Sequence, residues 1–329
     1  MKRVTIKEVA KLAEVSISTV SRYLADPTSI NPVSAKNVSK AIKEFNYVPN
    51  PFAQNLKSES TNVIAIIMPN IANAYFSEVC KTMCSLFYEE KYLVMICDCD
   101  NNPERERYYI DEMIRSRVAG LMISSCGSNG QYLQNIVADG HRVVLFDQME
   151  LSVDTDTVNE HNLLSSYNLT QAMLNQGHRR FVILNGPIAS ANMHFRLLGV
   201  KKALEEVSLT LEEKYVFSDL YKLPHVYSVI ETLLNDKNAP RCIIANNPIL
   251  LDHLVYTIKR LGLSVPDEYS VGGFAVRDPR YYYPIPVTAI LQQPTEVGLC
   301  AGELMLKRLR NKDKKFTPKQ IMIPTKLVL

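Results

Sequence analysis

TIKEVAKLAEVSISTVSRYL, residues 5–24, encodes two short helices joined by a tight turn. Thr5 is a typical N-cap residue, and Glu8 can bond back to the backbone amide of that cap, which is the capping-box pattern that begins a helix. Ser16 can cap a second helix after the turn, and the apolar residues of both helices fall on shared faces. This spacing predicts a helix-turn-helix, a unit whose second helix enters the major groove of DNA.

The outward positions of these two helices carry short, polar or basic side chains. The predicted DNA contacts in this stretch are Thr5, Ser16, Ile17, Ser18, Thr19, Ser21 and Arg22. Arg22 is the best suited of them to a guanine base or a phosphate. The competing interpretation of this stretch alone is an ordinary pair of surface helices.

A third helix is predicted to begin at Asn31 and Pro32, which are an N-cap and a proline at the first helical position. Its buried face would hold Val38, Ala41, Ile42 and Phe45. Residues 1–60 contain nine Lys or Arg and five Asp or Glu, a net charge of +4 within a chain total of +3. Positive charge is therefore concentrated in the predicted DNA-binding part, as phosphate binding favours.

Two prolines, Pro49 and Pro51, end the third helix and precede a short polar segment. We predict a headpiece at residues 1–48, a hinge at 49–60 and a larger domain at 61–329. With 329 residues and 47% hydrophobic residues, the chain is long enough to bury a sizeable core.

The larger domain alternates short apolar runs with amphipathic segments. We expect strands at 63–68, 92–97, 120–124, 143–146, 181–184, 242–245 and 270–274, and helices at 76–90, 104–117, 163–174, 196–206, 250–261 and 296–309. Continuously apolar strands are typical of parallel sheets covered on both faces, so the prediction is a doubly wound α/β fold. So many strands favour two lobes, with a ligand cleft at the carboxyl ends of the strands.

Residues 5–24, the run Asn46-Tyr47-Val48-Pro49-Asn50 and the run Ala53-Gln54-Asn55-Leu56 resemble the headpiece and hinge of the lactose-repressor (LacI/GalR) family of bacterial transcription regulators. The resemblance implies that Ile17, Ser18 and Arg22 read bases, and that the hinge folds on the operator in a dimer. It adds Asn50, Gln54 and Leu56 as DNA contacts, with Leu56 wedged between base steps. The chain departs from the family at Glu14, where glycine is usual in the turn.

The resemblance continues to the end of the chain and implies a periplasmic-binding-protein-like sensor. Landmarks include Asn73-Ala74-Tyr75-Phe76, Gly177-His178, Asn246-Asn247, Val265-Pro266 and Gln293-Pro294. It implies chain crossings near 161, 292 and 323, with lobe one at about 61–161 and 293–322 and lobe two at about 162–292 and 323–329. The implied effector contacts are Asn73, Tyr75, Asp147, Arg196, Asn246, Asn247, Ala275 and Gln292.

Sugar-binding members of the family carry carboxylates where this chain has Ala275, Asn247 and His161. Because carboxylates repel anions and Arg196 remains, we expect an acidic effector such as a sugar acid or sugar phosphate. An ordinary sugar and an inactive pocket are the alternatives. The expected function is a repressor of a carbohydrate-utilisation operon that binds a pseudo-palindromic operator as a homodimer. Tyr281, Tyr282 and Tyr283 would cover the cleft mouth or form an interface.

Other classes of protein find little support. No run reaches the roughly 18 apolar residues of a membrane helix, and no secretion signal precedes the headpiece, so we expect a cytoplasmic protein with no membrane partner. The seven cysteines lack metal-binding spacing, and nucleotide-binding and hydrolase motifs are missing, which predicts no metal, no cofactor and no enzyme. A solute-binding protein without a DNA role is the alternative function.

Overall fold

The computed structural model describes residues 4–47, 61–148, 150, 152–220, 222–311 and 317–329. The chain divides into two compact units, Met1–Thr61 and Asn62–Leu329. We call the first the headpiece and the second the sensor body, and we describe each by itself. The predicted hinge contacts Asn50, Gln54 and Leu56 lie outside the described residues.

The headpiece contains the three predicted helices, α1 (Ile6–Leu12), α2 (Ile17–Ala25) and α3 (Pro32–Glu44), with a 3₁₀ turn η1 (Pro27–Ser29) between the last two. Its core consists of Val9, Ala10, Ala13, Val20, Val38 and Ala41. Six small buried side chains make a modest core, so the helix caps carry a larger share of the stability here than in a larger domain.

The predicted helix caps are present in the structure. The Glu8 carboxylate accepts a hydrogen bond from the backbone N–H of Thr5 at 2.7 Å. The Ser16 hydroxyl accepts one from the Thr19 N–H at 3.1 Å. Asn31 likewise caps α3, and Pro32 occupies its first turn. Each cap satisfies a backbone donor that has no partner within its helix.

Glu14 ends α1 in the left-handed backbone region, with φ of 53°. The N–H of Glu14 bonds to the carbonyl of Lys11, and the N–H of Val15 bonds to the carbonyl of Ala10. This pair of bonds is the Schellman motif, whose left-handed position is usually glycine. The turn of the helix-turn-helix therefore forms with a residue for which this conformation is costly.

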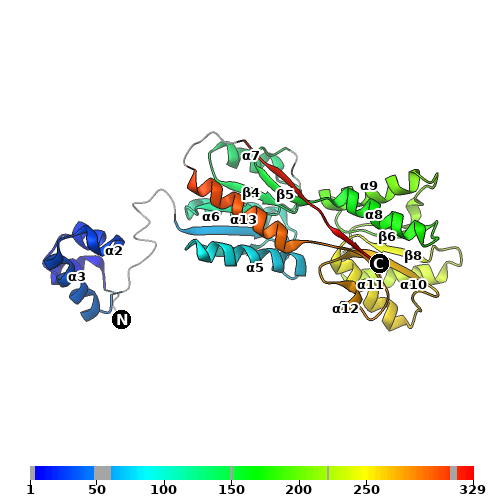
Figure 1. The fold of residues 1–329 in the computed structure, drawn as a ribbon, viewed down its shortest axis with the longest axis horizontal. Coiled ribbons are helices and arrows are strands. Elements are labelled where there is room, and N and C mark those ends of the chain that lie inside the picture. The colour runs from blue at the N-terminus through cyan, green and yellow to red at the C-terminus, as the bar shows by residue number, and fades with distance from the viewer. Residues whose placement is uncertain (1–3, 48–60, 149, 151, 221, 312–316) are drawn as a thin grey trace. The chain divides into compact units, whose positions relative to one another are not determined.

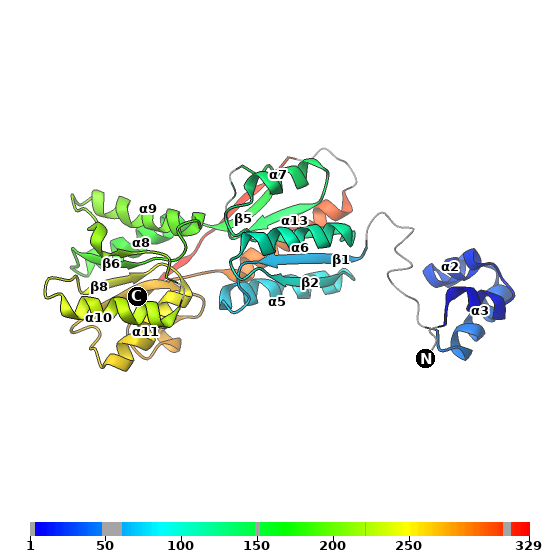
Figure 2. The same cartoon turned by 180° about the vertical axis from the view of Figure 1, so that it is seen from behind.

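The first sheet of the sensor body has six parallel strands in the order β11-β5-β4-β3-β1-β2. These strands are β1 (Val63–Met68), β2 (Leu93–Asp98), β3 (Gly120–Ile123), β4 (Val143–Phe146), β5 (Asp156–Glu160) and β11 (Gln320–Ile323). The associated helices are α5 (Ala74–Glu89), α6 (Pro103–Arg115), α7 (Gly130–Ala138) and α13 (Pro294–Arg310). Figure 1 shows α5 and α13 over one face of this sheet, and the turned view in Figure 2 shows α6 over the other.

The second sheet has the order β12-β10-β9-β8-β6-β7. Its strands are β6 (Phe181–Leu184), β7 (Val216–Phe217), β8 (Cys242–Ala245), β9 (Ser270–Ala275), β10 (Thr288–Leu291) and β12 (Lys326–Val328), and only the β10–β12 pair is antiparallel. Its helices are α8 (Asn162–Asn175), α9 (Ala191–Glu205), α10 (Leu223–Asn235), α11 (Pro248–Leu261), the short α12 (Pro279–Tyr282) and the 3₁₀ turn η3 (Glu213–Tyr215).

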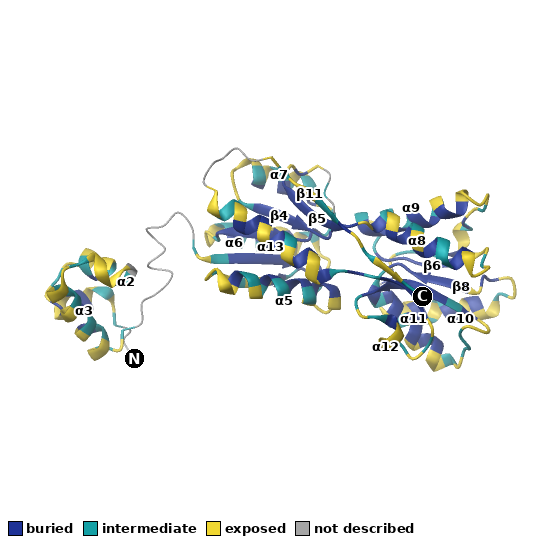
Figure 3. Ribbon diagram, viewed as in Figure 1, coloured by how far each residue is buried: buried dark blue, intermediate teal, exposed yellow. Residues whose placement is uncertain are grey.

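Strand side chains alternate between two apolar layers. In β1, Ile64 and Ile66 belong to the layer with α5 and α13, whereas Ala65 and Ile67 belong to the layer with α6 and α7. The dark-blue strands in Figure 3 show this burial on both faces. The predicted doubly wound α/β fold with a helix-turn-helix headpiece is thus confirmed, because continuous apolar strands require helices on both faces.

The chain passes between the two sheets three times: between β5 and α8, between β10 and α13, and between β11 and β12. The last passage follows Ile323, so the predicted lobe boundary at 322 falls one residue inside β11. We call the part around the first sheet lobe one and the part around the second sheet lobe two.

Five strands, β5, β7, β10, β11 and β12, were not predicted. β5 reads DTVNE and contains a single apolar residue, yet all five of its residues are buried. Its Asp156 accepts hydrogen bonds from Arg308 Nε at 2.6 Å and from the Lys319 N–H at 2.7 Å. Polar partners from distant segments make this burial possible, and hydrophobic periodicity cannot detect them.

Candidate functional site

The headpiece exposes the outer face of α2. Ile17, Ser18 and Arg22 are exposed, whereas Val20 is fully buried in the core. Ile17 is 45% exposed, and its apolar side chain suits contact with a thymine methyl group. Of the remaining predicted contacts on the headpiece helices, Thr5 and Ser16 are exposed, and Thr19 and Ser21 are half-buried.

Hydroxyl groups at the start of α2 form a local network. The Ser16 Oγ atom lies 2.7 Å from Ser18 Oγ and 2.8 Å from Thr19 Oγ1. Ser16 and Thr19 also complete the N-cap, so these side chains have a structural task besides any contact with DNA. Arg22, two turns further on, projects from the exposed face with five N–H donors.

The sensor body contains a cleft of about 630 Å³ between its two lobes. Six of the eight predicted effector contacts line it: Asn73, Tyr75, Asp147, Arg196, Asn247 and Gln292. Asn73 and Asn247 also cap helices, because their side-chain oxygens accept from the N–H groups of Tyr75 and Leu250. The cleft volume is within the usual range for small-molecule sites.

The structure does not bring Asn246 or Ala275 to the cleft lining. Asn246 is fully buried, its carbonyl accepts from Arg196 Nη1 at 2.6 Å, and its side-chain amide donates to Asn185 at 3.0 Å. Ala275 is fully buried in the apolar core of lobe two. The cleft lining thus includes neither residue in this structure, and their role as effector contacts stays a prediction.

Arg196 is held in a fixed position on α9, with only 2% of its surface exposed. Its Nε atom donates to Asn162 Oδ1 at 2.7 Å, and its guanidinium carbon lies 3.8 Å from the centre of the Phe274 ring. Both hydrogen-bond acceptors of Arg196, Asn162 Oδ1 and the Asn246 carbonyl, are uncharged. Burial lowers the pKa of Arg196, and the nearby Glu160, Asp147 and Tyr75 oppose this effect.

Two buried carboxyl groups lie near Arg196. Burial raises the pKa of Asp147 to about 7; Arg196 opposes that rise, and Glu160 adds to it. Burial also raises the pKa of Glu160, which is 2% exposed, although Gln292 and the Gln293 backbone stabilise its charge. The floor of the cleft therefore holds two carboxyl groups for one guanidinium, and a carboxylate is costly to keep there without a further positive or hydrogen-bond-donating partner.

Two glutamine amides of the cleft turn their nitrogens toward the protein, in contrast to Asn73 and Asn247, whose oxygens bond to backbone N–H groups. Gln292 Nε2 donates to Glu160 Oε2 at 2.6 Å, and Gln148 Nε2 donates to Ser190 Oγ at 2.8 Å. The Oε1 atoms of both glutamines are buried and have no hydrogen-bond partner among the described residues. Both residues line the cleft, so it presents acceptor atoms to a ligand.

Direct contacts join the lobes at the cleft. The Gln148–Ser190 hydrogen bond runs from the end of β4 in lobe one to the start of α9 in lobe two. Gly127 of lobe one lies so close to lobe two that an added Cβ atom would be 2.6 Å from the Ala189 carbonyl oxygen. These contacts connect the ligand-lining residues to the relative position of the lobes.

Sequence reasoning did not assign Glu160, Gln148, Ser190 or Asn192 to the cleft. Gln148, Ser190 and Asn192 line it, and Glu160 lies behind Gln292. The one available signal was the position of Gln148 directly after a predicted strand, since strand ends collect ligands in this fold. Glu160 gave no signal, because β5 itself was missed.

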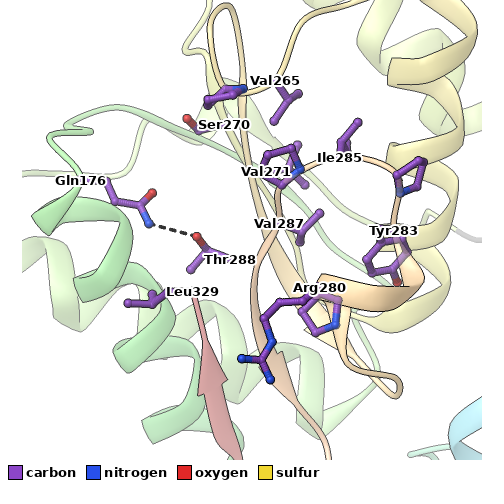
Figure 4. A pocket seen from close by; sticks show the side chains of 14 residues that line it. Gln176, Val265, Ser270, Val271, Arg280, Tyr283, Ile285, Val287, Thr288 and Leu329 are labelled. Atoms are coloured by element: carbon purple, nitrogen blue, oxygen red, sulfur yellow. Dashed lines mark hydrogen bonds between the residues drawn. The ribbon is translucent and has the colours of Figure 1, made fainter.

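A second cavity of about 640 Å³ lies in lobe two, away from these residues (Figure 4). Its wall includes Pro279, Tyr283, Pro284 and Pro286, and a hydrogen bond from Gln176 Nε2 to Thr288 Oγ1 of 3.0 Å crosses one side. Tyr283 lines this cavity and donates to Asp252 at 2.7 Å, while Tyr281 is 86% exposed. None of the three adjacent tyrosines is among the residues that line the effector cleft, so their predicted place over its mouth or at an interface stays a prediction.

Comparison with known proteins identifies both parts of the chain. Residues 5–50 match the family model for bacterial regulatory proteins of the lacI family, and residues 170–329 match the model for a periplasmic binding protein-like domain. The chain thus joins a lacI-family helix-turn-helix domain to a periplasmic binding protein-like domain. It is a ligand-responsive, DNA-binding transcription repressor of the lacI type rather than an enzyme.

Relatives that align over nearly the whole chain are transcriptional repressors. The HTH-type transcriptional repressor PurR of Histophilus somni is 28% identical over 313 residues, which cover 94% of this chain and 93% of that protein. The HTH-type transcriptional repressor CytR of Escherichia coli is 27% identical over 308 residues, with coverage of 93% and 90%.

Solved structures of the same fold align with all or nearly all of the chain. The lac repressor dimer bound to operator and the anti-inducer ONPF matches with a TM-score of 0.83 at 21% identity, covering 100% of this chain and 98% of that one. The complex of the transcriptional regulator CelR with cellobiose matches with a TM-score of 0.72 at 20% identity, covering 99% of each chain.

The described residues hold neither a candidate metal cluster nor a candidate membrane-spanning helix. They contain no group of three or more His, Cys, Asp or Glu side chains arranged to hold a metal ion. Over the same residues, no helix combines the length and the apolar character needed to cross a bilayer.

Proposed function

We propose that this chain is a homodimeric repressor that binds a pseudo-palindromic operator. Its affinity for the operator would depend on whether a ligand occupies the cleft. One observation carries the proposal: the same chain holds a helix-turn-helix with an exposed polar α2 face and a separate two-lobed body with a ligand-sized cleft. A ligand that binds one arrangement of the lobes better than another shifts the equilibrium between them, and this supplies the coupling.

The DNA contacts are assigned by exposure. Ile17, Ser18 and Arg22 face outward on α2 and would meet base edges in the major groove. Thr5 and Ser16 lie at helix N-termini, where hydroxyl and N–H groups suit phosphate oxygens. Asn50, Gln54 and the wedge Leu56 remain assigned from the sequence resemblance.

The dimer would use the edge of the first sheet. β2 is the edge strand of that sheet, and Leu93, Met95 and Ile96 on it are 61%, 42% and 40% exposed. An apolar edge strand is an aggregation hazard unless another chain covers it. Tyr88, at the end of the neighbouring α5, adds a further large exposed ring. Covering this edge with the same edge of a second copy gives the two-fold symmetry that a palindromic operator requires.

The effector would be a small sugar-like molecule, and the operon one of carbohydrate use. The cleft volume and its amide and carboxyl lining suit a polyhydroxy compound, and Tyr75 offers an aromatic side chain beside these groups. The acidic effector expected from the missing carboxylates is less well supported. Glu160 supplies a buried carboxyl group that the sequence analysis did not include.

Fluorescence anisotropy on promoter fragments, with and without a panel of sugars, tests the regulatory function. We expect salt-dependent binding that at least one cleft ligand changes severalfold. A protein that binds sugars but shows no salt-dependent affinity for any promoter fragment would instead be a solute-binding protein. Light scattering tests the dimer surface: Met95→Lys should give monomers, and Tyr108→Lys, which alters an exposed tyrosine on α6, should leave the dimer intact.

A further inference from the structure

The two carboxyl groups at the floor of the cleft have unequal numbers of hydrogen-bond donors, and this difference restricts the chemistry of a ligand that can bind there. Asp147, at the end of β4, and Glu160, at the end of β5, are buried together with Arg196 of α9. Glu160 already has two donors, Gln292 Nε2 at 2.6 Å and the Gln293 N–H at 2.5 Å. Asp147 faces the cleft with less support: the Tyr75 hydroxyl and the Asn192 amide stabilise its charge only in part.

Several donors at the floor of the cleft are already bonded within the protein, although Lys222 and His225 also line the cleft. Arg196 directs Nε and Nη1 to Asn162 and Asn246, and both glutamine amides direct their nitrogens to protein acceptors. Gln292 is 4% exposed, lines the cleft and keeps an Oε1 atom with no partner among the described residues. A ligand that donates hydrogen bonds would satisfy this atom, whereas a ligand carboxylate or phosphate placed here would face Asp147 and the amide oxygens of Gln292 and Gln148.

We propose that the effector is an amine-bearing polyol of about monosaccharide size, such as an amino sugar, whose ammonium group lies against Asp147 and whose hydroxyl or N–H groups donate to Gln292 and Gln148. One positive charge from the ligand balances the two carboxylates and one guanidinium of the floor. The inference rests on the proposed function, since it names the chemistry of the same cleft, and it excludes sugar acids and sugar phosphates as the preferred class.

The test uses the purified full-length protein and matched triplets built on several sugar skeletons, each with a neutral parent, its amino sugar and its uronic acid. Calorimetry gives the affinity of each compound. We expect the amino sugars to bind at least about tenfold more tightly than their neutral parents, because each gains a charge-assisted hydrogen bond to Asp147. Tighter binding of the acids, equal binding within the triplets, or no binding by any amino sugar would overturn the inference.

Two variants separate the contact from a general effect on the fold. Asp147→Asn keeps the shape of the side chain and should bring the affinity for the amino sugar down to that of the neutral parent. Asp139→Asn changes an exposed carboxylate of the same lobe, at the end of α7, and should leave all affinities unchanged. If Asp147→Asn lowers the affinity for the neutral parent and the amino sugar by the same factor, the ammonium contact is wrong.

A parallel anisotropy measurement distinguishes this inference from the regulatory proposal. If operator binding responds to a neutral or acidic sugar and to no amino sugar, the protein is an effector-controlled repressor and the inference about the amine is wrong. If an amino sugar binds through Asp147 but no compound changes the operator affinity, the inference about the cleft is supported and the proposed regulatory function is wrong.

Discussion

In the headpiece, the side chains assigned to DNA are exposed and are held by bonds that span only a few residues, such as Ser16 to Thr19. In the effector cleft, most of the corresponding side chains are buried, and they come from α5, α9, the start of α11 and the ends of β4, β5 and β10. A single change in the headpiece should therefore alter DNA contact and little else. A change in the cleft should alter ligand binding, lobe position and stability together, because buried polar groups share their partners.

The largest effect should follow replacement of Arg196 by alanine. The change leaves Asp147 and Glu160 buried without their cation, and we expect the free energy of unfolding of the sensor body to fall by about 3–5 kcal/mol. The effector response should be lost, while operator binding persists under conditions in which the body stays folded. Urea titration followed by circular dichroism measures the first effect, and anisotropy measures the second.

Arg277→Ala is the control, because Arg277 is an exposed cation of the same lobe that lies over the Tyr282 ring. It should cost less than about 1 kcal/mol. Equal losses in the two variants, or a normal effector response in Arg196→Ala, would contradict the role assigned to Arg196.

Asp147→Asn should stabilise the empty protein at high pH. The pKa of Asp147 in the folded protein, about 7, lies above the ordinary 3.8. Between these values the folded protein keeps a proton that the unfolded chain has released, so this group lowers stability progressively as pH rises from about 4 to 7. The asparagine variant should be more stable than the native protein at pH 8, by up to about 4 kcal/mol, and the difference should vanish near pH 4.

Thermal unfolding across pH 4 to 8 measures this difference. The groups that face Asp147 are Tyr75 from α5, Glu160 from β5 and Arg196 and Asn192 from α9, and all of them remain in the variant. Parallel pH profiles for the native protein and Asp147→Asn would show that Asp147 does not titrate in this window.

Arg22→Ala tests the local character of the headpiece. We expect operator affinity to fall by about 1–3 kcal/mol and base preference to relax at one position in each half-site. The stability of the sensor body and the affinity of the effector should not change. Anisotropy on operators with single base substitutions measures the preference; a loss that is uniform across all substitutions would assign Arg22 to a phosphate instead.

The smallest effect concerns the turn residue Glu14. Glu14→Gly should stabilise the headpiece by about 1 kcal/mol, because glycine adopts positive φ without the steric cost of a side chain. It should also raise operator affinity most at low salt, because a negative charge near the predicted DNA side is removed. Hydrogen exchange of the α1 amides in the full-length protein measures the stability.

Asn46 provides the matched comparison for Glu14. It ends α3 with φ of 44° and makes the same pair of backbone bonds, through Asn46 to Lys43 and Tyr47 to Ile42. Asn46→Gly should stabilise the headpiece less, because asparagine tolerates this conformation, and should not change the salt dependence. If both variants alter the salt dependence equally, the effect of Glu14 is conformational and not electrostatic.

The sequence by itself determined the headpiece almost completely. Caps at Thr5, Ser16 and Asn31 act within three residues, and apolar spacing selects the faces that carry Val9, Val20 and Val38, so short-range chemistry is enough. Seven of the twelve described strands of the body were also predicted, because long apolar runs are typical of strands covered on both faces.

Only the tertiary structure decided the chemistry of the cleft. β5 is polar in sequence and is buried because Arg308, Lys319 and Gln292 reach it from more than 130 residues away. Its Glu160 changes the charge balance beside Arg196, and the direction of each glutamine amide depends on partners in other elements. Burial and the pairing of polar groups across the fold decide the ionisation of carboxyl groups and the donors left for a ligand, and residue type alone does not encode either.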